Sequence, residues 1–418
     1  MTHRWTLLAW LLLVAVALSA CSAVSSVPAA ANNPAEEASA ADRPSAHPAE
    51  RDYPDLIVRE LHRRANEPRP VERSALPPRH LDVDTFPVSL VDRNRIVLGG
   101  PPPDGIAPID DPNFERADTV DWLAADEAVI AVRVGDTVRG YPVQILIWHE
   151  IVNDTIDGVP VAVTYCPLCN SAVVFDRRHQ GQTLDFGTSG SVYQSALVMY
   201  DRQTESLWTH FDGRAVVGDL VGGRLEQLPA STVSWEQFRS AHPTAEVLSR
   251  DTGRSRPYGR NPYGAYDQRD APLTGFFSGD VDAREAAMER VVGVTAAEPV
   301  AVRAAHLAEV GVIETTVAGT PLTLWSVPGL ASSLNDDTVA GGDHIGASGV
   351  FVAEHGGRTL SFTRDGQRFV DAQTGSTWNI LGEAVAGPLA GATLESIPHV
   401  DSFWFAWSTY QPETTLVE

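Results

Sequence analysis

An internal repeat constrains the fold of this chain more than any other feature of its sequence. The octapeptide DRQTESLW at 201–208 reappears as DAQTGSTW at 371–378. Further matches are 213–220 with 382–389, Trp235 with Trp404, and, more weakly, Gly158 with Gly319 and Leu146 with Leu307. Self-similarity of this kind indicates that one folding unit occurs twice. We therefore expect one unit at 126–250, a second at 288–418 and a connector at 251–287.

Within a unit, the residue pattern predicts strands with a few short helices. Two runs rich in β-branched residues, 151–156 and 159–165, are separated by Asp-Gly, a pair that favours a tight hairpin turn. Pro142 stands where a short helix would begin. Residues 234–241 and 401–410 have helical patterns at matching places of the two units. The expected fold class is β-rich α+β, with two tandem units packed together as one body.

The first 21 residues have the pattern of an export signal. Arg4 supplies a positive charge, and residues 5–18 form an apolar run that is too short to span a bilayer comfortably. The run ends in Leu-Ser-Ala-Cys, which resembles a bacterial lipobox and implies cleavage before Cys21 and a diacylglycerol on its sulfur. An ordinary secretory signal with an incidental cysteine is the alternative. We expect a protein anchored to the cell membrane by lipid at Cys21 and facing outside the cytoplasm.

Two segments separate this anchor from the first unit. Residues 22–52 are rich in Ala, Ser, Pro, Glu and Asn, which predicts a flexible linker. Residues 53–125 contain many Pro and Asp residues and predict mostly loop that wraps the body of the protein. The formal net charge of −23 argues against a nucleic-acid partner, because an acidic surface repels phosphates. The sequence identifies no protein partner.

The three cysteines divide into an anchor and a pair. If Cys21 carries lipid, Cys166 and Cys169 remain as one Cys-Pro-Leu-Cys motif. Outside the cytoplasm such a pair can be a metal site, a redox couple or a structural disulfide.

The pair and two neighbouring polar residues occur in the first unit only. His149, Glu150, Cys166 and Cys169 align with Val310, Gly311, Val327 and Leu330 of the second unit. A packing role does not require this asymmetry, since the scaffold residues survive in both units. We infer that the first unit carries the chemistry and that the second is a structural partner. The alternative is that the second unit changed without functional constraint and lost residues that had no role in chemistry.

The predicted hairpin brings His149 toward the cysteines. A two-residue Asp-Gly turn fixes the register of the strands, and counting back from it places His149 opposite Cys166. Glu150 then faces Tyr165. Directly opposed Cβ atoms lie about 4.5–5.5 Å apart, so we expect His149 to share a site with the cysteines. His210 is an additional candidate ligand, although a lone histidine is more often satisfied by hydrogen bonds.

Three chemical interpretations remain open. Cys166, Cys169 and His149 could bind copper or zinc, which thiolates and imidazole suit. The β-type sequence on both sides of the pair favours a metal knuckle over the helix start of a thioredoxin-like motif. In a redox couple, the two cysteines are catalytic, His149 lowers the pKa of one thiol, and Glu150 orients His149 or accepts a proton. In a non-catalytic envelope binding or scaffold protein, the pair is a structural disulfide. Whether the protein is an enzyme stays open.

Several long motifs resemble the domain of unknown function 3179 family. In chain order they are WHEIVND at 148–154, TYCPLCNSA at 164–172, FGTSG at 186–190 and FVDAQTGSTW at 369–378. The resemblance extends roughly from residue 99 to the C-terminus. It implies an exported, often lipid-anchored prokaryotic protein and brings no known reaction. Asn170 stands where this family is expected to have Gly, a departure that leaves the Cys pair intact.

Overall fold

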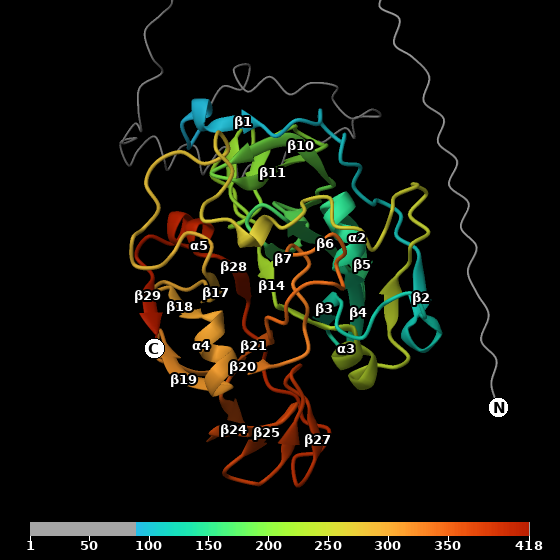
Figure 1. Ribbon diagram of the computed structural model, residues 1–418, viewed down its shortest axis with the longest axis vertical. Helices are drawn as coiled ribbons and strands as arrows, with labels where there is room; N and C mark the ends of the chain where they lie inside the picture. Colours follow the sequence, from blue (N-terminus) through green and yellow to red (C-terminus); the bar gives the residue numbers. More distant parts are fainter. Residues whose placement is uncertain (1–88, 418) are drawn as a thin grey trace, which may run out of the picture. The chain divides into compact units, whose positions relative to one another are not determined.

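The computed structural model describes residues 89–417 of the chain (Figure 1). Cys21, the export signal, the linker at 22–52 and the first part of the 53–125 segment lie outside the described residues, and their predictions stay predictions. Within the described range, no helix is long and apolar enough to cross a membrane.

Strands outnumber helices throughout the described part of the chain. The strands of the first half are β1 (Ile96–Leu98), β2 (Phe114–Arg116), β3 (Ala128–Val134), β4 (Thr137–Pro142), β5 (Ile151–Ile156), β6 (Val159–Cys166), β7 (Ser171–Asp176), β8 (Arg178–His179), β9 (Gln182–Thr183), β10 (Phe186–Tyr193), β11 (Ala196–Asp201), β12 (Leu207–Thr209), β13 (Ala215–Val217), β14 (Gln227–Leu228), β15 (Ala230–Ser234) and β16 (Glu246–Leu248). Those of the second half are β17 (Arg290–Val294), β18 (Val300–Arg303), β19 (Val312–Val317), β20 (Thr320–Val327), β21 (Ala347–Val352), β22 (Glu354–His355), β23 (Arg358–Thr359), β24 (Phe362–Asp365), β25 (Arg368–Asp371), β26 (Thr377–Trp378), β27 (Ala384–Ala386), β28 (His399–Phe403) and β29 (Thr415–Val417). The helices are α2 (Val143–His149), α3 (Trp235–Ala241), α4 (Ala304–Val310) and α5 (Trp404–Tyr410), with short 3-10 turns η2 (Arg93–Arg95), η3 (Ala117–Thr119) and η4 (Tyr266–Gln268). The predicted β-rich α+β class is confirmed.

Two sheets share one strand order and one set of directions. In the first half the order is β15-β3-β4-β16, extended by β2, and in the second half it is β28-β17-β18-β29. In each sheet the first two pairs are antiparallel and the third is parallel. A short helix, α2 or α4, directly follows the third strand of this order. The two halves therefore build sheets of the same pattern.

The predicted hairpin is present in the first half. β5 and β6 pair in antiparallel fashion with Ile156 opposite Val159. Asp157 and Gly158 connect them with φ values of 47° and 76°. Positive φ at both central residues is typical of the tight turn that Asp-Gly favours. β7 and β14 extend this hairpin into a four-stranded sheet.

Helix α2 begins directly after Pro142, as the sequence predicts, and ends at His149. Glu150 follows with a φ of 59°, and its backbone N–H donates to the carbonyl oxygen of Leu146 at 2.7 Å. This positive φ turns the chain abruptly from the helix into β5. The turn positions His149 and Glu150 at the end of the sheet that carries the cysteines.

The repeated octapeptide forms the same buried turn twice. The indole nitrogen of Trp208 donates to Asp201 Oδ2 at 2.8 Å, and that of Trp378 donates to Asp371 Oδ2 at 3.0 Å. All four side chains are inaccessible to solvent. Both tryptophans therefore act in core packing, as predicted from their matching positions.

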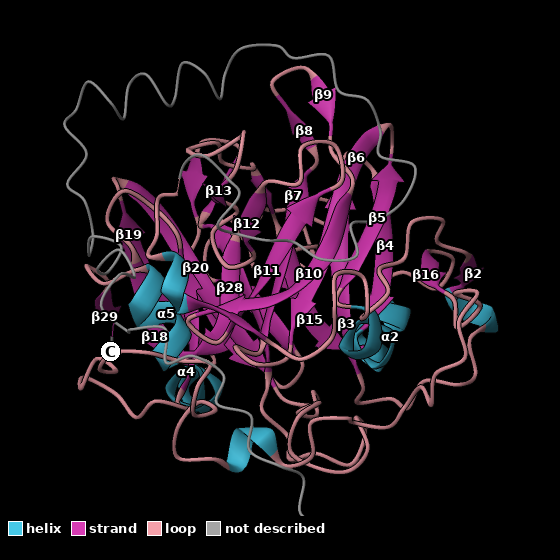
Figure 2. Ribbon diagram, turned by 90° about the horizontal axis from the view of Figure 1, so that it is seen from above, coloured by secondary structure: helices cyan, strands magenta, loops and turns pink. Residues whose placement is uncertain are grey.

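One hydrophobic core extends through both halves. It includes Trp208 and Trp235 of the first half and Trp325 and Trp404 of the second. β28 packs beside β7, and β15 packs beside β21. Figure 2 shows the strands gathered in the middle, with α2, α4 and α5 toward the periphery. The turn between β6 and β7, which holds both cysteines, consequently lies against the second half.

Candidate metal centre

The Cys-Pro-Leu-Cys motif forms a tight turn between β6 and β7. Cys166 ends β6 and pairs with Ser171, the first residue of β7. Cys166 and Cys169 are free thiols with exposed fractions of 1% and 0%. The Cys169 sulfur lies 3.0 Å from Ser171 Oγ, and the backbone N–H of Leu197 donates to the Cys166 sulfur at 3.3 Å. The backbone N–H of Phe403, at the end of β28, donates to the carbonyl oxygen of Cys169 at 3.1 Å. Both halves of the chain therefore hold this turn.

His210 completes a group of three metal-ligating side chains. It follows β12, and its backbone N–H donates to the carbonyl oxygen of Leu197 at 3.0 Å. One ring nitrogen and the sulfurs of Cys166 and Cys169 all lie within 4.8 Å of one another. His210 is fully buried, and neither ring nitrogen has a hydrogen-bond partner among the described residues. A buried polar group without a partner costs about 1–3 kcal/mol, so this imidazole stands out as a candidate ligand.

Burial controls the protonation of these three side chains. It lowers the pKa of His210 to about 3, so the imidazole is neutral and keeps a lone pair for a metal. Burial and the neighbouring Cys166 raise the pKa of Cys169 well above its ordinary value. Burial acts in the same direction on Cys166, but hydrogen bonds from the Cys169 thiol and from backbone N–H groups bring its pKa below the ordinary value. The pKa values of the two thiols are thus shifted in opposite directions, down for Cys166 and up for Cys169.

His149, which the sequence favoured as the third ligand, is not part of this group. It ends α2, and the ladder of β5 and β6 begins only with Ile151 opposite Thr164. Counting the hairpin register back to His149 is wrong, because the chain is helical at that residue. Its Nδ1 lies 2.7 Å from the carbonyl oxygen of Ala107, and its Nε2 lies 2.7 Å from the Tyr258 hydroxyl. Both ring nitrogens are therefore engaged in hydrogen bonds.

Glu150 lies near Cys166. The backbone N–H of Tyr165 donates to the carbonyl oxygen of Glu150 at 2.8 Å, which agrees with the predicted pairing of these residues. The Tyr263 hydroxyl donates to Glu150 Oε1 at 3.4 Å. Burial, with a smaller contribution from the charge of Cys166, raises the pKa of Glu150 to about 8. This carboxyl group is therefore mostly protonated at neutral pH, and the hydrogen bonds of His149 go to Ala107 and Tyr258.

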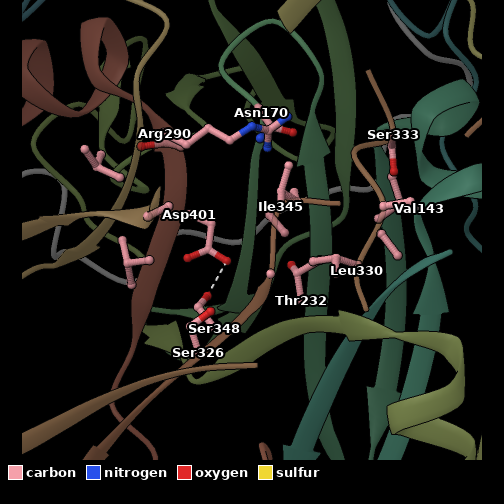
Figure 3. A pocket seen from close by; sticks show the side chains of 18 of the residues that line it. Val143, Asn170, Thr232, Arg290, Ser326, Leu330, Ser333, Ile345, Ser348 and Asp401 are labelled. Atoms are coloured by element: carbon pink, nitrogen blue, oxygen red, sulfur yellow. Dashed lines mark hydrogen bonds between the residues drawn. The ribbon is translucent and has the colours of Figure 1, made fainter. Parts of the chain in front are cut away.

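A cavity of about 60 Å³ lies between the cysteine turn and the second half. Figure 3 shows Arg290 reaching toward Asn170, and Asp401 accepting a hydrogen bond from Ser348 at 2.6 Å. Tyr165 and Asn170, which flank the Cys pair in sequence, line this cavity, but the three residues of the candidate metal centre do not. They also do not line the outer clefts of about 250, 530 and 610 Å³. The centre is therefore closed toward each of these spaces.

The comparison that identified the Cys pair would also have favoured His210. In the second half, Asn379 and Ile380 follow Trp378, so no histidine stands where His210 follows Trp208 in the first half. The asymmetry that marks Cys166 and Cys169 thus extends to this histidine. His210 lies far from the Cys-Pro-Leu-Cys motif in the sequence, so the spacing does not indicate that it contacts the two cysteines.

The fold and this group of residues define a class of protein in which a strand-rich body encloses two thiols and an imidazole. The chain belongs to the family described as Protein of unknown function (DUF3179), whose model matches residues 103–414. A search of curated proteins and a search of solved structures found no match. The resemblance noted in the sequence is therefore confirmed at the level of the family.

Proposed function

We propose that this protein binds one soft metal ion, copper(I) or zinc(II), through Cys166, Cys169 and His210. The observation that carries the proposal is the buried imidazole of His210. Its nitrogens have no hydrogen-bond partner within residues 89–417, and one of them lies within 4.8 Å of both sulfurs. A metal held at about 2.0–2.3 Å from nitrogen and sulfur would supply that missing partner. Thiolate and imidazole are ligands that these two metals prefer.

The number of ligands favours copper(I) over zinc(II). Structural zinc sites almost always have four protein ligands, and zinc sites with three leave a position open for water or substrate. The described residues offer three ligands here, and all three are enclosed. Thiolate sulfur suits both metals, so the number of ligands decides between them. Copper(I) is therefore the proposed occupant, and zinc(II) is its competitor in the test.

A thiol redox couple is the second candidate function. It is favoured by the opposite pKa shifts of the two thiols, lowered for Cys166 and raised for Cys169. Such a split suits one attacking thiolate and one resolving thiol. An exchange partner must reach a sulfur, however, and both sulfurs are enclosed. The remaining alternative, a structural disulfide in an envelope scaffold protein, gives no role to the unpartnered imidazole.

The proposal includes a tandem duplication of one unit. It is supported by the repeated octapeptide, by the equal strand order of the two sheets and by the matching Asp–Trp turns. The ligand residues occur in one copy, so one metal ion per chain is expected.

The proposal also places the metal centre outside the cytoplasm on a lipid-anchored chain. It is supported by the apolar run at 5–18 and the lipobox-like residues that end at Cys21. Metal capture would then take place at the outer side of the cell membrane.

The metal content of the purified full-length protein tests the function. The protein is loaded with copper(I) under reducing, oxygen-free conditions, or with zinc(II), and unbound metal is removed by gel filtration. The wild type is expected to retain one copper(I) per chain, whereas Cys166→Ser and His210→Leu retain none. His149→Gln is the matched control, because the ring nitrogens of His149 already have partners, and it is expected to retain copper(I).

Three other outcomes would overturn the proposal. Loss of copper in His149→Gln with retention in His210→Leu would move the site to His149. A metal-free wild type whose thiols oxidise reversibly near the potential of the glutathione pool would support the redox couple. A metal-free wild type with no reactive thiol before reduction would support the disulfide scaffold.

A further inference from the structure

The segment that joins the two halves crosses the region of the closed metal centre. We call residues 250–268 the strap. Its regular element is the 3-10 turn η4. Its backbone pairs with another segment at an isolated bridge between Arg260 and Thr338, and the backbone N–H of Asp267 donates to the carbonyl oxygen of Leu334 at 3.4 Å. β6, β7 and β12, which support the ligands, belong to extended sheets. Segments with few backbone pairings open at lower free energy than sheet strands do, so we expect the strap to open before the strands that hold the ligands.

Two tyrosine hydroxyls of the strap reach the residues that end α2. The Tyr258 hydroxyl lies 2.7 Å from Nε2 of His149. The Tyr263 hydroxyl donates to Glu150 Oε1 at 3.4 Å. His149 and Glu150 are both buried beneath the strap. These contacts give His149 a role that is separate from metal ligation, since it anchors the strap.

A third tyrosine reaches the cysteine turn itself. The Tyr266 hydroxyl donates at 3.0 Å to the carbonyl oxygen of Leu168, which lies between the two cysteines in sequence. Burial raises the pKa of Tyr263 and of Tyr266, and the charge of Cys166 is among the smaller contributions to both shifts. Both hydroxyls therefore lie near this sulfur, and three tyrosine hydroxyls of the strap contact the residues around the centre.

We propose that the strap is the gate of the metal centre and that Tyr258, Tyr263 and Tyr266 are positioning residues that set how fast Cys166 and Cys169 become accessible. Control of metal exchange by the strap rests on the metal-binding function proposed above. Control of access to the thiols does not require that a metal binds.

Alkylation of the thiols in the metal-free full-length protein tests the gate. Iodoacetamide is the probe, and mass spectrometry follows its addition at Cys166 and Cys169 separately. When opening and closing are faster than alkylation, the rate is proportional to the open population. Loss of one hydroxyl hydrogen bond raises that population about two- to tenfold. Tyr258→Phe, Tyr263→Phe and Tyr266→Phe are each expected to accelerate alkylation by this factor.

A matched control separates the gate from general destabilisation. Tyr200 donates its hydroxyl to Asp104 Oδ2 at 2.8 Å, outside the strap. Tyr200→Phe removes a comparable bond and is expected to change the rate less than about twofold. Low urea concentrations are expected to leave the wild-type rate unchanged, because local opening exposes little surface. Equal acceleration in Tyr200→Phe, or a steep rise of the wild-type rate with urea, would show that access requires global unfolding and would overturn the proposal.

Transfer of copper(I) to an excess of a chelator gives a second readout. The strap variants are expected to release copper(I) faster by the same factor, with one ion per chain still bound at the start. A wild type that binds no copper would refute the proposed function, and the alkylation rates would still decide the gate. Unchanged alkylation rates in a protein that binds copper normally would refute the gate alone.

Discussion

Trp208 donates its indole N–H to the carboxylate of Asp201 at 2.8 Å, and neither side chain reaches solvent. Trp378 and Asp371 repeat the bond in the second half at 3.0 Å, yet the two carboxylates titrate differently. Burial raises the pKa of Asp201 to about 6. For Asp371, hydrogen bonds from Trp378 and Thr374 outweigh the effect of burial and lower the pKa.

This difference predicts a pH dependence of stability that originates at Asp201. Between about pH 4 and pH 6 the folded state holds a proton at Asp201 that the unfolded state releases. The contribution of Asp201 to the free energy of unfolding therefore falls as the pH rises through this window, by up to about 3 kcal/mol, and is constant above it. Urea unfolding from pH 4 to pH 7 should show this fall in the wild type and not in Asp201→Asn.

Asp371→Asn is the control for that experiment. A lowered pKa stabilises the folded state above about pH 4, and this stability is lost as the pH falls through the folded pKa. The free energy of unfolding of the wild type, relative to that of Asp371→Asn, should therefore rise with increasing pH, and this rise should occur at lower pH than the change at Asp201. Identical pH profiles for the two variants would contradict the assignment.

Replacing the unpartnered imidazole should stabilise the metal-free protein. His210→Leu removes two buried nitrogens that have no hydrogen-bond partner in the described part of the chain, and it introduces an apolar side chain of similar size. The free energy of unfolding of the metal-free protein should rise by about 1–2 kcal/mol. In excess copper(I) the order should reverse, since the ligand stabilises only the wild type. A metal-free variant that is less stable than the wild type would mean that His210 has a structural partner.

The shared core predicts that the two halves unfold together. Trp325 stacks on Phe369 at 4.2 Å between ring centroids and also contacts Phe351 and Phe362 at 4.8 Å each. Trp325→Ala should lower the free energy of unfolding by about 3–5 kcal/mol. Circular dichroism and thiol exposure at Cys166 should still report one coincident transition in urea. Two separated transitions would show that the halves are independent domains.

The second hairpin offers a stabilising substitution. Ala318 and Gly319 connect β19 to β20, and Ala318 is exposed with a φ of 48°. Alanine is disfavoured at positive φ, whereas Asn and Asp tolerate it. Ala318→Asn should raise the free energy of unfolding by about 0.5–1 kcal/mol, as measured by urea unfolding. Asp157→Ala, the reverse change in the first hairpin, should lower it.

Local signals made much of the fold predictable. The Asp-Gly pair at 157–158 fixed the register of β5 and β6, and Pro142 marked the start of α2. The matching patterns at Trp235 and Trp404 predicted α3 and α5, although residues 401–403 of the expected second helix belong to β28. Each of these signals acts over a few neighbouring residues, so the turn or helix that it causes can be predicted from the sequence alone.

The candidate metal centre was only partly predictable. Cys166 and Cys169 stood out because the second half lacks them, but the register argument failed at His149. His149 is the last residue of helix α2, and a count of strand positions applies only from Ile151, where the β5–β6 ladder begins. His210 meets the cysteines through the packing of separate sheets, which no spacing in the sequence encodes.

The bond between Phe403 and Cys169 has a consequence for the order of events in biosynthesis. A chain leaves the ribosome from its N-terminus, so the cysteine turn emerges roughly 230 residues before the strand that completes it. Until that strand is made, the turn lacks the hydrogen bond from Phe403. Maturation of the centre therefore follows the folding of the whole polypeptide, and a truncated product that lacks β28 would carry the ligands without the finished centre.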